Sequence, residues 1–387
     1  MTTKKDVTVI IGRFNPFHNG HAHLLTKALD ESHLVIVLVG SSGQSRSLKN
    51  PFTFAERAQM IERWKASAFP VGRLPAHMVL LPLSDYPYSN SLWIKSVQNS
   101  VKMAIDRYQV LQPVFAEHFH NNVTLVGSDR DDSTWYLKAF PQWKLDLVDE
   151  HHVDLSGTGV REVLYTQQIT KESIKVLSKK IPASTREFLI EFAERGKLKP
   201  LQEEYAFIQK YKKSWENAPY EPTFSTADAV VIQSGHVLVV KRGANPGRGL
   251  WALPGGFVNP KERVEDAAIR ELIEETGIKL ADGKRAAKIT EQMLRGAIRG
   301  KELFDAPDRS ARGRTITVAY LFKLDDTKPL PLVKGQNVPA YEAGGKEIVE
   351  TEAAMWLPLN VALETTDKWF EDHLSIIEWA VSVKDDR

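Results

Sequence analysis

The feature that most constrains the fold is an alternation of short, wholly apolar strands with helices in the first part of the chain. Val7–Ile11 is an apolar strand, His21–Leu29 has the apolar spacing of a helix, and Leu34–Val39 is a second apolar strand. A strand that is apolar on both faces belongs in a parallel sheet that helices cover on both sides. The alternation continues to Leu145–Val148. It predicts an α/β fold with an open, doubly wound, Rossmann-like parallel sheet.

The second part of the chain has a different pattern. Charge-rich helical sequence ends near Lys213, and the prolines of Asn217–Pro222 favour a linker. Beyond it, Ala227–Ile232 and Val237–Lys241 alternate as a hairpin, and Arg314–Leu324 is another long strand, so we expect a mixed sheet between helices, an α/β/α domain. A chain of 387 residues exceeds what one hydrophobic core usually serves. The predicted division is a first domain over residues 1–195, a helical segment and linker over 196–222, and a second domain over 223–387.

Composition excludes several classes of protein. The formal net charge is only +2, so no strong overall field attracts nucleic acid or an anionic membrane, and we expect neither as a partner. The chain has no cysteine, which removes disulfides, thiolate catalysis and cysteine-ligated metal sites. The longest apolar run, Leu34–Val39, is far shorter than the roughly 20 residues that span a bilayer. We expect a cytoplasmic protein whose metal sites use oxygen or imidazole.

A candidate phosphate-binding loop lies between the first strand and the first helix. Residues Gly12–His21 read GRFNPFHNGH. Glycines let the backbone approach an anion, a helix start offers unpaired N–H groups, and His18 and His21 add donors that can carry charge. Ser156, Thr158 and Arg161 supply a matching set of hydroxyls and a bidentate cation at a second helix start. Either segment alone is compatible with an ordinary turn or a capped helix; together they favour binding of phosphates.

These segments resemble the HxGH and SxTxxR motifs of the adenylyltransferase superfamily. The longer match, which adds Asn50–Thr53 and Glu56-Arg57, resembles archaeal-type nicotinamide-mononucleotide (NMN) adenylyltransferases over residues 6–170. The resemblance implies transfer of AMP from ATP to NMN, giving NAD and pyrophosphate. It implies that His18 and His21 contact the ATP phosphates and that Arg161 holds the outgoing pyrophosphate, a reaction that needs alignment and charge neutralisation rather than a protein nucleophile. The further residues expected at the ATP and NMN sites are Gly12, Arg13, Phe14, Asn15, Asp85, Trp93, Gly127, Asp129, Ser156 and Thr158.

Some of these positions are less specific than others. Asn15 departs from the Gln that is commoner in the family, which changes no charge. Trp93 offers a face on which a nicotinamide ring can stack, but a place in the core suits a tryptophan equally well. Gly127 and Asp129 follow a strand and are expected to form a second wall of the acceptor pocket. Relatives of this domain often assemble into homo-oligomers, so the resemblance allows a homo-oligomer here.

A cluster of carboxylates marks the second half of the chain. Glu271, Glu274 and Glu275 stand at i, i+3 and i+4, so a helix would place all three on one face. Unpaired carboxylates repel one another, and a hard divalent cation such as Mg²⁺, or Mn²⁺, relieves that repulsion. Gly256, Glu262, Arg270 and Gly277 stand at the spacings that complete the Nudix box, so residues 223–380 resemble Nudix hydrolases. Lys261 is a minor departure, because family members often have Gly there.

The resemblance implies the chemistry of this half. Nudix hydrolases cleave a nucleoside diphosphate linked to another group, with the cation held by Gly256, Glu271, Glu274 and Glu275 and with Glu274 and Glu275 catalytic. Segments around Arg242, Trp251, Arg314 and Phe370–His373 resemble the ADP-ribose pyrophosphatase branch, which implies hydrolysis of ADP-ribose to AMP and ribose 5-phosphate. Arg242 and Arg314 are expected to contact phosphate or ribose, although solvated surface positions are equally compatible with the sequence.

The sequence therefore predicts a bifunctional enzyme of NAD metabolism that binds ATP, NMN or NAD, and ADP-ribose. One alternative is that the first half uses another acceptor, such as nicotinate mononucleotide or phosphopantetheine. Another is that the second half binds or senses ADP-ribose without hydrolysing it, as Nudix-like regulators of NAD genes do. Those regulators carry a winged-helix module after the Nudix core, and few residues follow Asp372 here.

Overall fold

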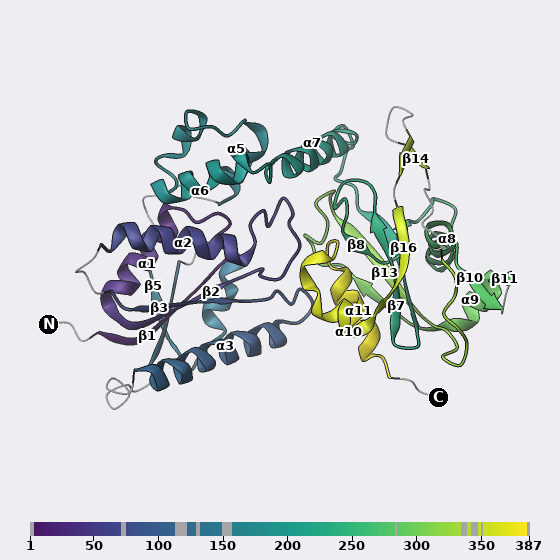
Figure 1. The fold of residues 1–387 in the computed structure, drawn as a ribbon, viewed down its shortest axis with the longest axis horizontal. Coiled ribbons are helices and arrows are strands. Elements are labelled where there is room, and N and C mark those ends of the chain that lie inside the picture. Colours follow the sequence, from purple (N-terminus) through teal and green to yellow (C-terminus); the bar gives the residue numbers. More distant parts are fainter. Residues whose placement is uncertain are drawn as a thin grey trace. The chain divides into compact units, whose positions relative to one another are not determined.

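The computed structural model describes residues 4–70, 75–112, 122–128, 132–148, 157–282, 285–333, 339–341, 347–349 and 351–384. The chain divides into two compact units, Met1–Gln202 and Glu203–Arg387 (Figure 1). No helix within the described ranges has both the length and the apolar character needed to cross a membrane.

A five-stranded parallel sheet forms the centre of the first unit. Its strands lie in the order β3-β2-β1-β4-β5, and every neighbouring pair is parallel. The chain order reverses beside β1, so the carboxyl ends of β1 and β4 flank the point where such sheets bind ligands. The predicted doubly wound sheet is confirmed. The strands are β1 (Lys5–Gly12), β2 (Ser32–Val39), β3 (His77–Pro82), β4 (Val123–Gly127) and β5 (Lys144–Leu147).

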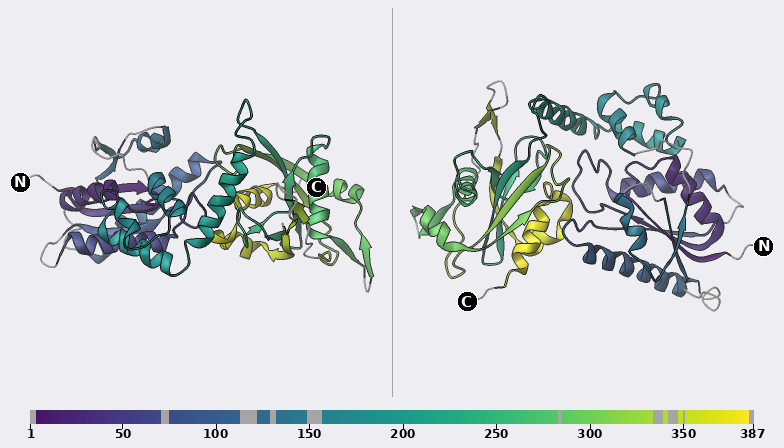
Figure 2. Two further views of the ribbon diagram at one scale, coloured as in Figure 1. Left: turned by 90° about the horizontal axis from the view of Figure 1, so that it is seen from above. Right: turned by 180° about the vertical axis from the view of Figure 1, so that it is seen from behind.

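Helices cover both faces of this sheet (Figure 1). The α3 face buries Val97 and Val101 against alternate residues of the central strands, including Val9 and Ile36. Helices α1 and α2 cover the opposite face, as the second view of Figure 2 also shows. This burial on both faces explains why β2 is apolar almost throughout. The helices are α1 (Asn19–Glu31), α2 (Phe54–Ala68), α3 (Asn90–Leu111), α5 (Gly157–Thr166) and α6 (Ala183–Glu194), with short 3₁₀ helices η1 (Asp132–Lys138) and η2 (Ser173–Leu177).

A mixed sheet forms the centre of the second unit, as the sequence predicts. Its main strands lie in the order β12-β13-β6-β7-β16, where β13 and β6 are parallel and the other pairs are antiparallel. Ser234 and Gly235 both have positive φ, at 48° and 69°, and turn β6 into β7. Two positive φ values are what a two-residue hairpin turn requires. The strands are β6 (Phe224–Gln233), β7 (His236–Arg242), β8 (Trp251–Ala252), β9 (Gly255–Phe257), β10 (Lys279–Asp282), β11 (Arg285–Lys288), β12 (Ile298–Phe304), β13 (Thr315–Lys323), β14 (Pro339–Tyr341), β15 (Glu347–Val349) and β16 (Thr351–Pro358).

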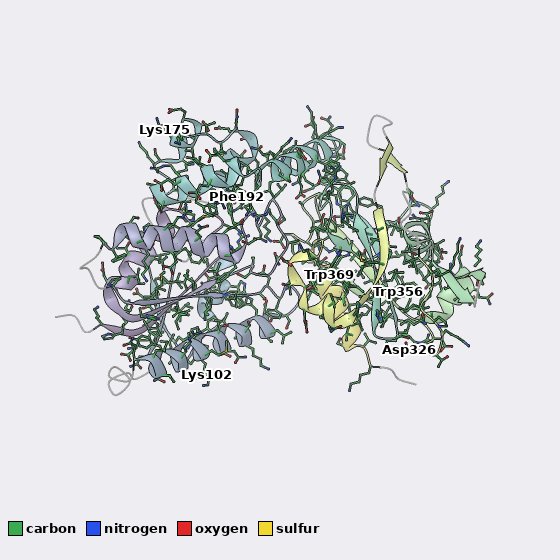
Figure 3. All side chains as sticks on the ribbon, in the orientation of Figure 1. Lys102, Lys175, Phe192, Asp326, Trp356 and Trp369 are labelled. Atoms are coloured by element: carbon green, nitrogen blue, oxygen red, sulfur yellow. The ribbon has the colours of Figure 1, made fainter. Side chains whose placement is uncertain are left out.

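Alternation along β6 divides the core of this unit into two layers. Ala229 and Val231 pack with α8 on one face, whereas Val230 packs with α10 and α11 on the other. Trp369 belongs to the second layer, where it is 2% exposed and lies near α10 and α11 (Figure 3). The helices are α7 (Lys199–Lys213), which spans the boundary between the units, α8 (Val264–Thr276), α9 (Glu291–Ala297), α10 (Leu359–Glu364) and α11 (His373–Ser382), with the 3₁₀ turn η3 (Thr366–Lys368).

Candidate active sites

The loop between β1 and α1 holds two histidines in a fixed pair. His18 is the N-cap of α1, and its Nδ1 accepts a hydrogen bond from the backbone N–H of His21. The Nδ1 of His21 accepts in turn from the N–H of His18, and the two rings stack with centroids 3.5 Å apart. A neutral imidazole that accepts at Nδ1 carries its proton on Nε2. Both rings are therefore set with Nε2–H as the donor.

The structure joins this loop to the start of α5. Arg161 donates from Nη1 to the backbone oxygen of Asn15 at 2.7 Å and from Nη2 to Thr158 Oγ1 at 2.9 Å. Gly157 lies so close that a Cβ there would be 3.1 Å from the Asn15 oxygen. The two motifs, more than a hundred residues apart in the sequence, thus form one site at the carboxyl end of β1. Burial lowers the pKa of the Arg161 guanidinium from its ordinary value.

Asn15 itself links the loop to the segment before α2. Its Oδ1 accepts from the N–H of Phe52 at 3.2 Å, and its Nδ2 donates to Asn50 Oδ1 at 3.2 Å. At the start of α2, Thr53 and Glu56 cap each other's backbone N–H groups, the capping box that begins many helices. The residue that departs from the family pattern therefore has a structural role in holding the loop.

A buried arginine that the sequence gave no role supports the same loop. Arg57 is 1% exposed, and its guanidinium donates to the backbone oxygens of Arg13 at 2.7 Å and Gly40 at 2.6 Å. It also donates to the oxygens of Ser41 and Thr53 and to Ser42 Oγ. Burial lowers the pKa of Arg57 to about 10, so the side chain stays charged at neutral pH. It fixes the ends of β1 and β2 through backbone oxygens.

The other residues predicted for this site differ in their surroundings. Asp85 is exposed, and its carboxylate accepts from Ser41 N–H and Gln44 Nε2, which places it at the carboxyl end of β2. Trp93 packs against the core and lies 5.6 Å from Trp135 and 5.7 Å from Tyr136, centroid to centroid, so much of its surface is used in packing. Ser156 and Asp129 lie outside the described residues. Of the remaining residues, Gly12 and Phe14 pack together in the loop, Arg13 is exposed, and Gly127 ends β4 against Leu137.

The second unit contains a cavity of about 240 Å³ beside α8. Glu271, Glu275, Gly255 and Gly256 line it together with Asp228. A side chain at Gly256 would collide with the Glu271 carboxylate, so a larger residue there would displace this carboxylate from its position beside β9. Glu275 is 7% exposed, and its Oε2 accepts a hydrogen bond from Gly255 N–H at 2.9 Å. The Nudix spacing therefore brings backbone and carboxylate oxygens to one wall.

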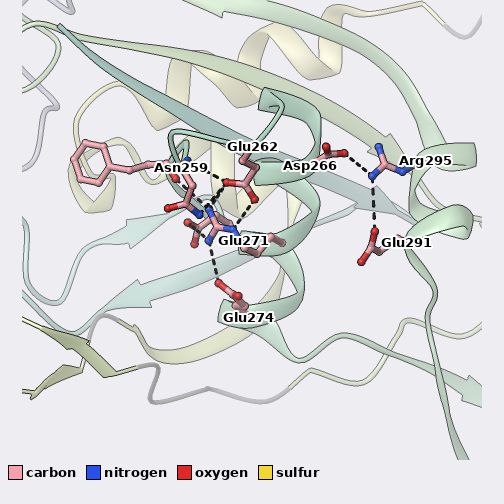
Figure 4. Close-up of polar contacts among 9 residues, drawn as sticks. Asn259, Glu262, Asp266, Glu271, Glu274, Glu291 and Arg295 are labelled. Atoms are coloured by element: carbon pink, nitrogen blue, oxygen red, sulfur yellow. Dashed lines mark hydrogen bonds and ion pairs between the residues drawn. The ribbon is translucent and has the colours of Figure 1, made fainter.

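The third glutamate of the cluster departs from the expectation. Glu274 is not among the residues that line the cavity, and its side chain is 46% exposed. Arg270 holds it at 3.0 Å, holds Glu271 at 2.7 Å, and donates from Nε and Nη2 to Glu262 (Figure 4). Hydrogen bonding to Glu262, with smaller contributions from the other two carboxylates, raises the pKa of Arg270 above its usual range. Glu271 and Glu275 therefore line the cavity without Glu274, whose carboxylate lies beside Arg270.

Within the described residues, no three histidine, aspartate or glutamate side chains are arranged to hold a metal ion. The chemistry of the cavity wall nevertheless fits a hard divalent cation, because carboxylate and backbone oxygens are its preferred ligands. Glu271 and Glu275 present such oxygens beside Gly256. A cation bound there would compete with Arg270 for Glu271.

Basic and aromatic residues also line the cavity. Arg242 lines it, with the guanidinium carbon 4.0 Å from the Phe370 ring centroid. Arg312 lines it too, 5.1 Å from the Phe257 centroid. Arg314, expected from the sequence to contact substrate, is not among the lining residues, because its guanidinium turns to the backbone and carboxylate oxygens of Asp305. The structure therefore places Arg312, rather than Arg314, at the wall of the cavity.

Four further residues lie in or next to the cavity, and the sequence assigned none of them an individual role. Arg309 and Asp372 form a bidentate ion pair at 2.6 and 2.9 Å with side chains 3% and 8% exposed. His373 accepts at Nδ1 from the N–H of Leu253 at 2.8 Å, and burial lowers its pKa. Glu371 has a positive φ of 48° and a buried Oε1 with no hydrogen-bond partner within the described residues. Only the order Glu371-Asp372-His373 hinted at them, and their partners lie far away in the sequence.

Each half of the chain matches a different family of known proteins. The family model described as cytidylyltransferase-like matches residues 9–163, and that described as NUDIX domain matches residues 222–380. A nicotinamide/nicotinic acid mononucleotide adenylyltransferase of Acinetobacter baylyi is 32% identical over 202 residues, which cover 52% of this chain and 94% of the relative. An ADP-ribose pyrophosphatase of Methanocaldococcus jannaschii is 30% identical over 131 residues, which cover 32% of this chain and 69% of the relative.

A solved structure matches nearly the whole chain. It is a bifunctional NMN adenylyltransferase/ADP ribose pyrophosphatase from Francisella tularensis, with a TM-score of 0.79 and 32% sequence identity. The match covers 97% of this chain and 98% of that one. This chain belongs to that bifunctional family. The family resemblance predicted from the sequence, with a nucleotidyltransferase domain before a Nudix domain, is confirmed. A second structure of the Francisella protein, complexed with AMP and a Mn ion, matches with a TM-score of 0.78.

Proposed function

We propose that the first unit transfers AMP from ATP to NMN, giving NAD and pyrophosphate. We propose that the second unit hydrolyses ADP-ribose to AMP and ribose 5-phosphate with a divalent cation, Mg²⁺ or Mn²⁺. The observation that carries the proposal is the presence, in one chain, of the histidine pair tied to Arg161 through Asn15 and of the cavity lined by Glu271 and Glu275. The similarity to the Francisella enzyme over nearly its whole length supports both activities.

In the first unit, the chain's task is to align two anions. A phosphate oxygen of NMN attacks the α-phosphorus of ATP, and the bond from that phosphorus to pyrophosphate breaks. Negative charge grows on the leaving group, and fixed donors that meet it lower the barrier. His18 and His21 present Nε2–H groups, and Arg161 adds a charged fork at the start of α5. The mutual hydrogen bonds of the histidines and the link to Asn15 fix these donors before substrate binds.

In the second unit, a divalent cation would neutralise the diphosphate and activate the attacking water. Gly256, Glu271 and Glu275 would hold it through oxygen atoms. Gly255 fixes the rotamer of Glu275 by its N–H, and Glu274 acts on Arg270 from outside the cavity. Arg242, anchored by its Nε to the oxygen of Pro246 at 2.9 Å, would meet the diphosphate. The Francisella protein is complexed with AMP and a Mn ion, which supports a divalent cation as a cofactor of this chain.

The test is to supply the full chain with ATP, Mg²⁺ and an acceptor, and separately with ADP-ribose and Mg²⁺, and to separate the products by chromatography. NMN, nicotinate mononucleotide and phosphopantetheine serve as acceptors in parallel. The name of the Acinetobacter relative includes both mononucleotides, which makes nicotinate mononucleotide the second candidate acceptor. A strong preference for phosphopantetheine would refute the first activity. Binding of ADP-ribose without any release of AMP would refute the second and favour a sensing role.

A further inference from the structure

The arginines of the Nudix cavity differ in what neutralises them. Arg270 is paired with Glu262, Glu271 and Glu274, and Arg309 is paired with Asp372. Arg312 makes no ion pair with any residue that the structure describes. The cavity thus contains a cation whose charge the described part of the chain does not balance.

The Arg312 side chain is nevertheless held in place. Its Nε donates to Ser310 Oγ at 3.3 Å, and its guanidinium carbon lies 5.1 Å from the Phe257 centroid and 6.0 Å from the Phe370 centroid. Cation–π contacts of this kind orient a guanidinium plane against a ring. The two terminal nitrogens form no hydrogen bond with the described residues, so their in-plane N–H groups are available to a ligand.

The aromatic support is itself fixed by the preceding helix. Tyr211 and Trp215, at and just beyond the end of α7, lie 6.0 and 5.1 Å from the Phe224 ring, which lies 5.8 Å from that of Phe257. Gly313 follows Arg312 with φ at 144°, and a Cβ there would come within 3.3 Å of Phe224. This backbone conformation favours glycine. It lets Arg312 reach the cavity while Arg314 turns to Asp305.

We propose that Arg312 binds a non-bridging phosphate oxygen of the nucleoside diphosphate substrate and is a specificity-determining residue of the Nudix site. The inference rests on the hydrolase activity proposed above. The guanidinium carbon lies near two aromatic rings, and the terminal N–H groups of a guanidinium pair with phosphate oxygens in its plane. Asp228, Glu271 and Glu275 repel a diphosphate, and Arg312, which lines the same cavity, offsets that repulsion.

The main test compares Arg312→Ala with Arg299→Ala in the full chain. Arg299 is exposed, donates to backbone oxygens alone among the described residues, and provides a charge-matched control. We expect Arg312→Ala to lower kcat/KM for ADP-ribose by about tenfold or more, mainly through KM, because a charged hydrogen bond is lost. The control should match wild type within about twofold. Equal kinetics for both variants, or a loss confined to Arg314→Ala, would overturn the proposal.

Two further readouts separate phosphate binding from packing. Arg312→Gln keeps a planar polar group but removes the charge, so it should behave like Arg312→Ala, whereas a purely structural or stacking role predicts wild-type KM. The wild-type KM should also rise with salt concentration more steeply than that of Arg312→Gln, because one cation–phosphate contact is missing in the variant. Equal salt dependence would count against the proposal.

Failure of the proposed hydrolysis is distinguishable from failure of this inference. Isothermal titration of ADP-ribose in the presence of EDTA measures binding without turnover. If wild type binds but never releases AMP, the hydrolase activity fails, while a weaker Kd for Arg312→Ala still supports the phosphate contact. If wild type hydrolyses ADP-ribose and Arg312→Ala binds it with the same Kd as wild type, the proposed phosphate contact of Arg312 is refuted and the hydrolase activity stands.

Discussion

The buried guanidinium of Arg57 gives a prediction whose size follows from its contacts. It donates to backbone oxygens of Arg13, Gly40, Ser41 and Thr53 and to one hydroxyl. Arg57→Lys keeps the charge, but an ammonium has fewer donors, all on one nitrogen, so about two of these acceptors lose their partner. Each buried acceptor left without a donor costs about 1–3 kcal/mol. We expect the free energy of unfolding of the first domain to fall by about 2–6 kcal/mol.

The substitution should also reduce adenylyl transfer, because the carbonyl of Arg13 belongs to the loop that carries His18. A displacement of about 1 Å at a reacting centre can cost on the order of 100-fold in rate. Urea denaturation monitored by hydrogen exchange in peptides from β1 and β2 reports the first domain separately from the second. Transfer of AMP to NMN is measured on the same preparations at a urea-free reference point.

Arg63→Lys is the matched control. Arg63 lies on the same helix, α2, but is partly exposed and pairs with Glu191 at 2.8 Å. A partly exposed pair is worth about 1 kcal/mol or less, so this variant should stay close to wild type. If Arg57→Lys proves as stable and as active as Arg63→Lys, the role of Arg57 in fixing the loop is refuted.

Two further predictions concern the second domain. Burial lowers the pKa of His373 below its ordinary value of 6.5. As the pH falls, this histidine therefore takes up a proton in the unfolded chain before it does so in the folded domain. Below pH 6.5 the domain should lose up to about 1.4 kcal/mol of stability per pH unit. His373→Asn should remove this slope from urea titrations between pH 7.5 and 5.5, roughly the range in which histidine titrates, and an unchanged slope would contradict the assignment. The buried Oε1 of Glu371 adds negative charge to the cavity without a described hydrogen-bond partner. Glu371→Gln should therefore raise the Mn²⁺ concentration for half-maximal ADP-ribose hydrolysis several-fold, and an unchanged midpoint in the metal titration would contradict this.

The architecture was predictable because the pattern of apolar residues in a strand shows which of its faces are buried. The wholly apolar Leu34–Val39 has to be covered on both faces, and its place in the middle of a parallel sheet follows from that. The hairpin at Ser234-Gly235 was predictable from its turn residues. The positions of the strands in the sheets depend on these local signals and on the helices and turns that connect the strands.

The candidate sites were predictable only to the level of motif and spacing. His18 and His21 lie within one helical turn of each other, so the hydrogen bonds between them are local and follow from their spacing. The link between Asn15 and Arg161 depends on how far-apart segments meet, which no spacing reveals. The Nudix spacing predicted that Glu274 lies on the helix, but it did not predict that Glu274 pairs with Arg270. The position of Arg270 also depends on its hydrogen bond to Glu262, which lies in the loop before the helix.

Two arginines show most clearly what the sequence alone does not predict about the site. Arg312 and Arg314 are equivalent in sequence, on either side of a glycine just before β13. The φ of Gly313 and the packing of Phe224 decide which of them reaches the cavity. The Phe224 ring packs near Tyr211 of α7, and α7 precedes the region that the NUDIX domain model matches. A sequence pattern confined to that region therefore does not show which of the two arginines reaches the cavity.

The central claim is that one chain carries two independent anion-handling sites, and a cross-comparison of two variants tests it most directly. His21→Ala and Glu275→Gln are each assayed for NAD formation from NMN and ATP and for AMP release from ADP-ribose. The account predicts that His21→Ala loses about 100-fold or more of NAD formation and keeps ADP-ribose hydrolysis, because a fixed donor to the leaving phosphates is gone. Glu275→Gln should lose hydrolysis and keep NAD formation. If Glu275→Gln hydrolyses ADP-ribose like wild type, or His21→Ala forms NAD at the normal rate, the account is contradicted.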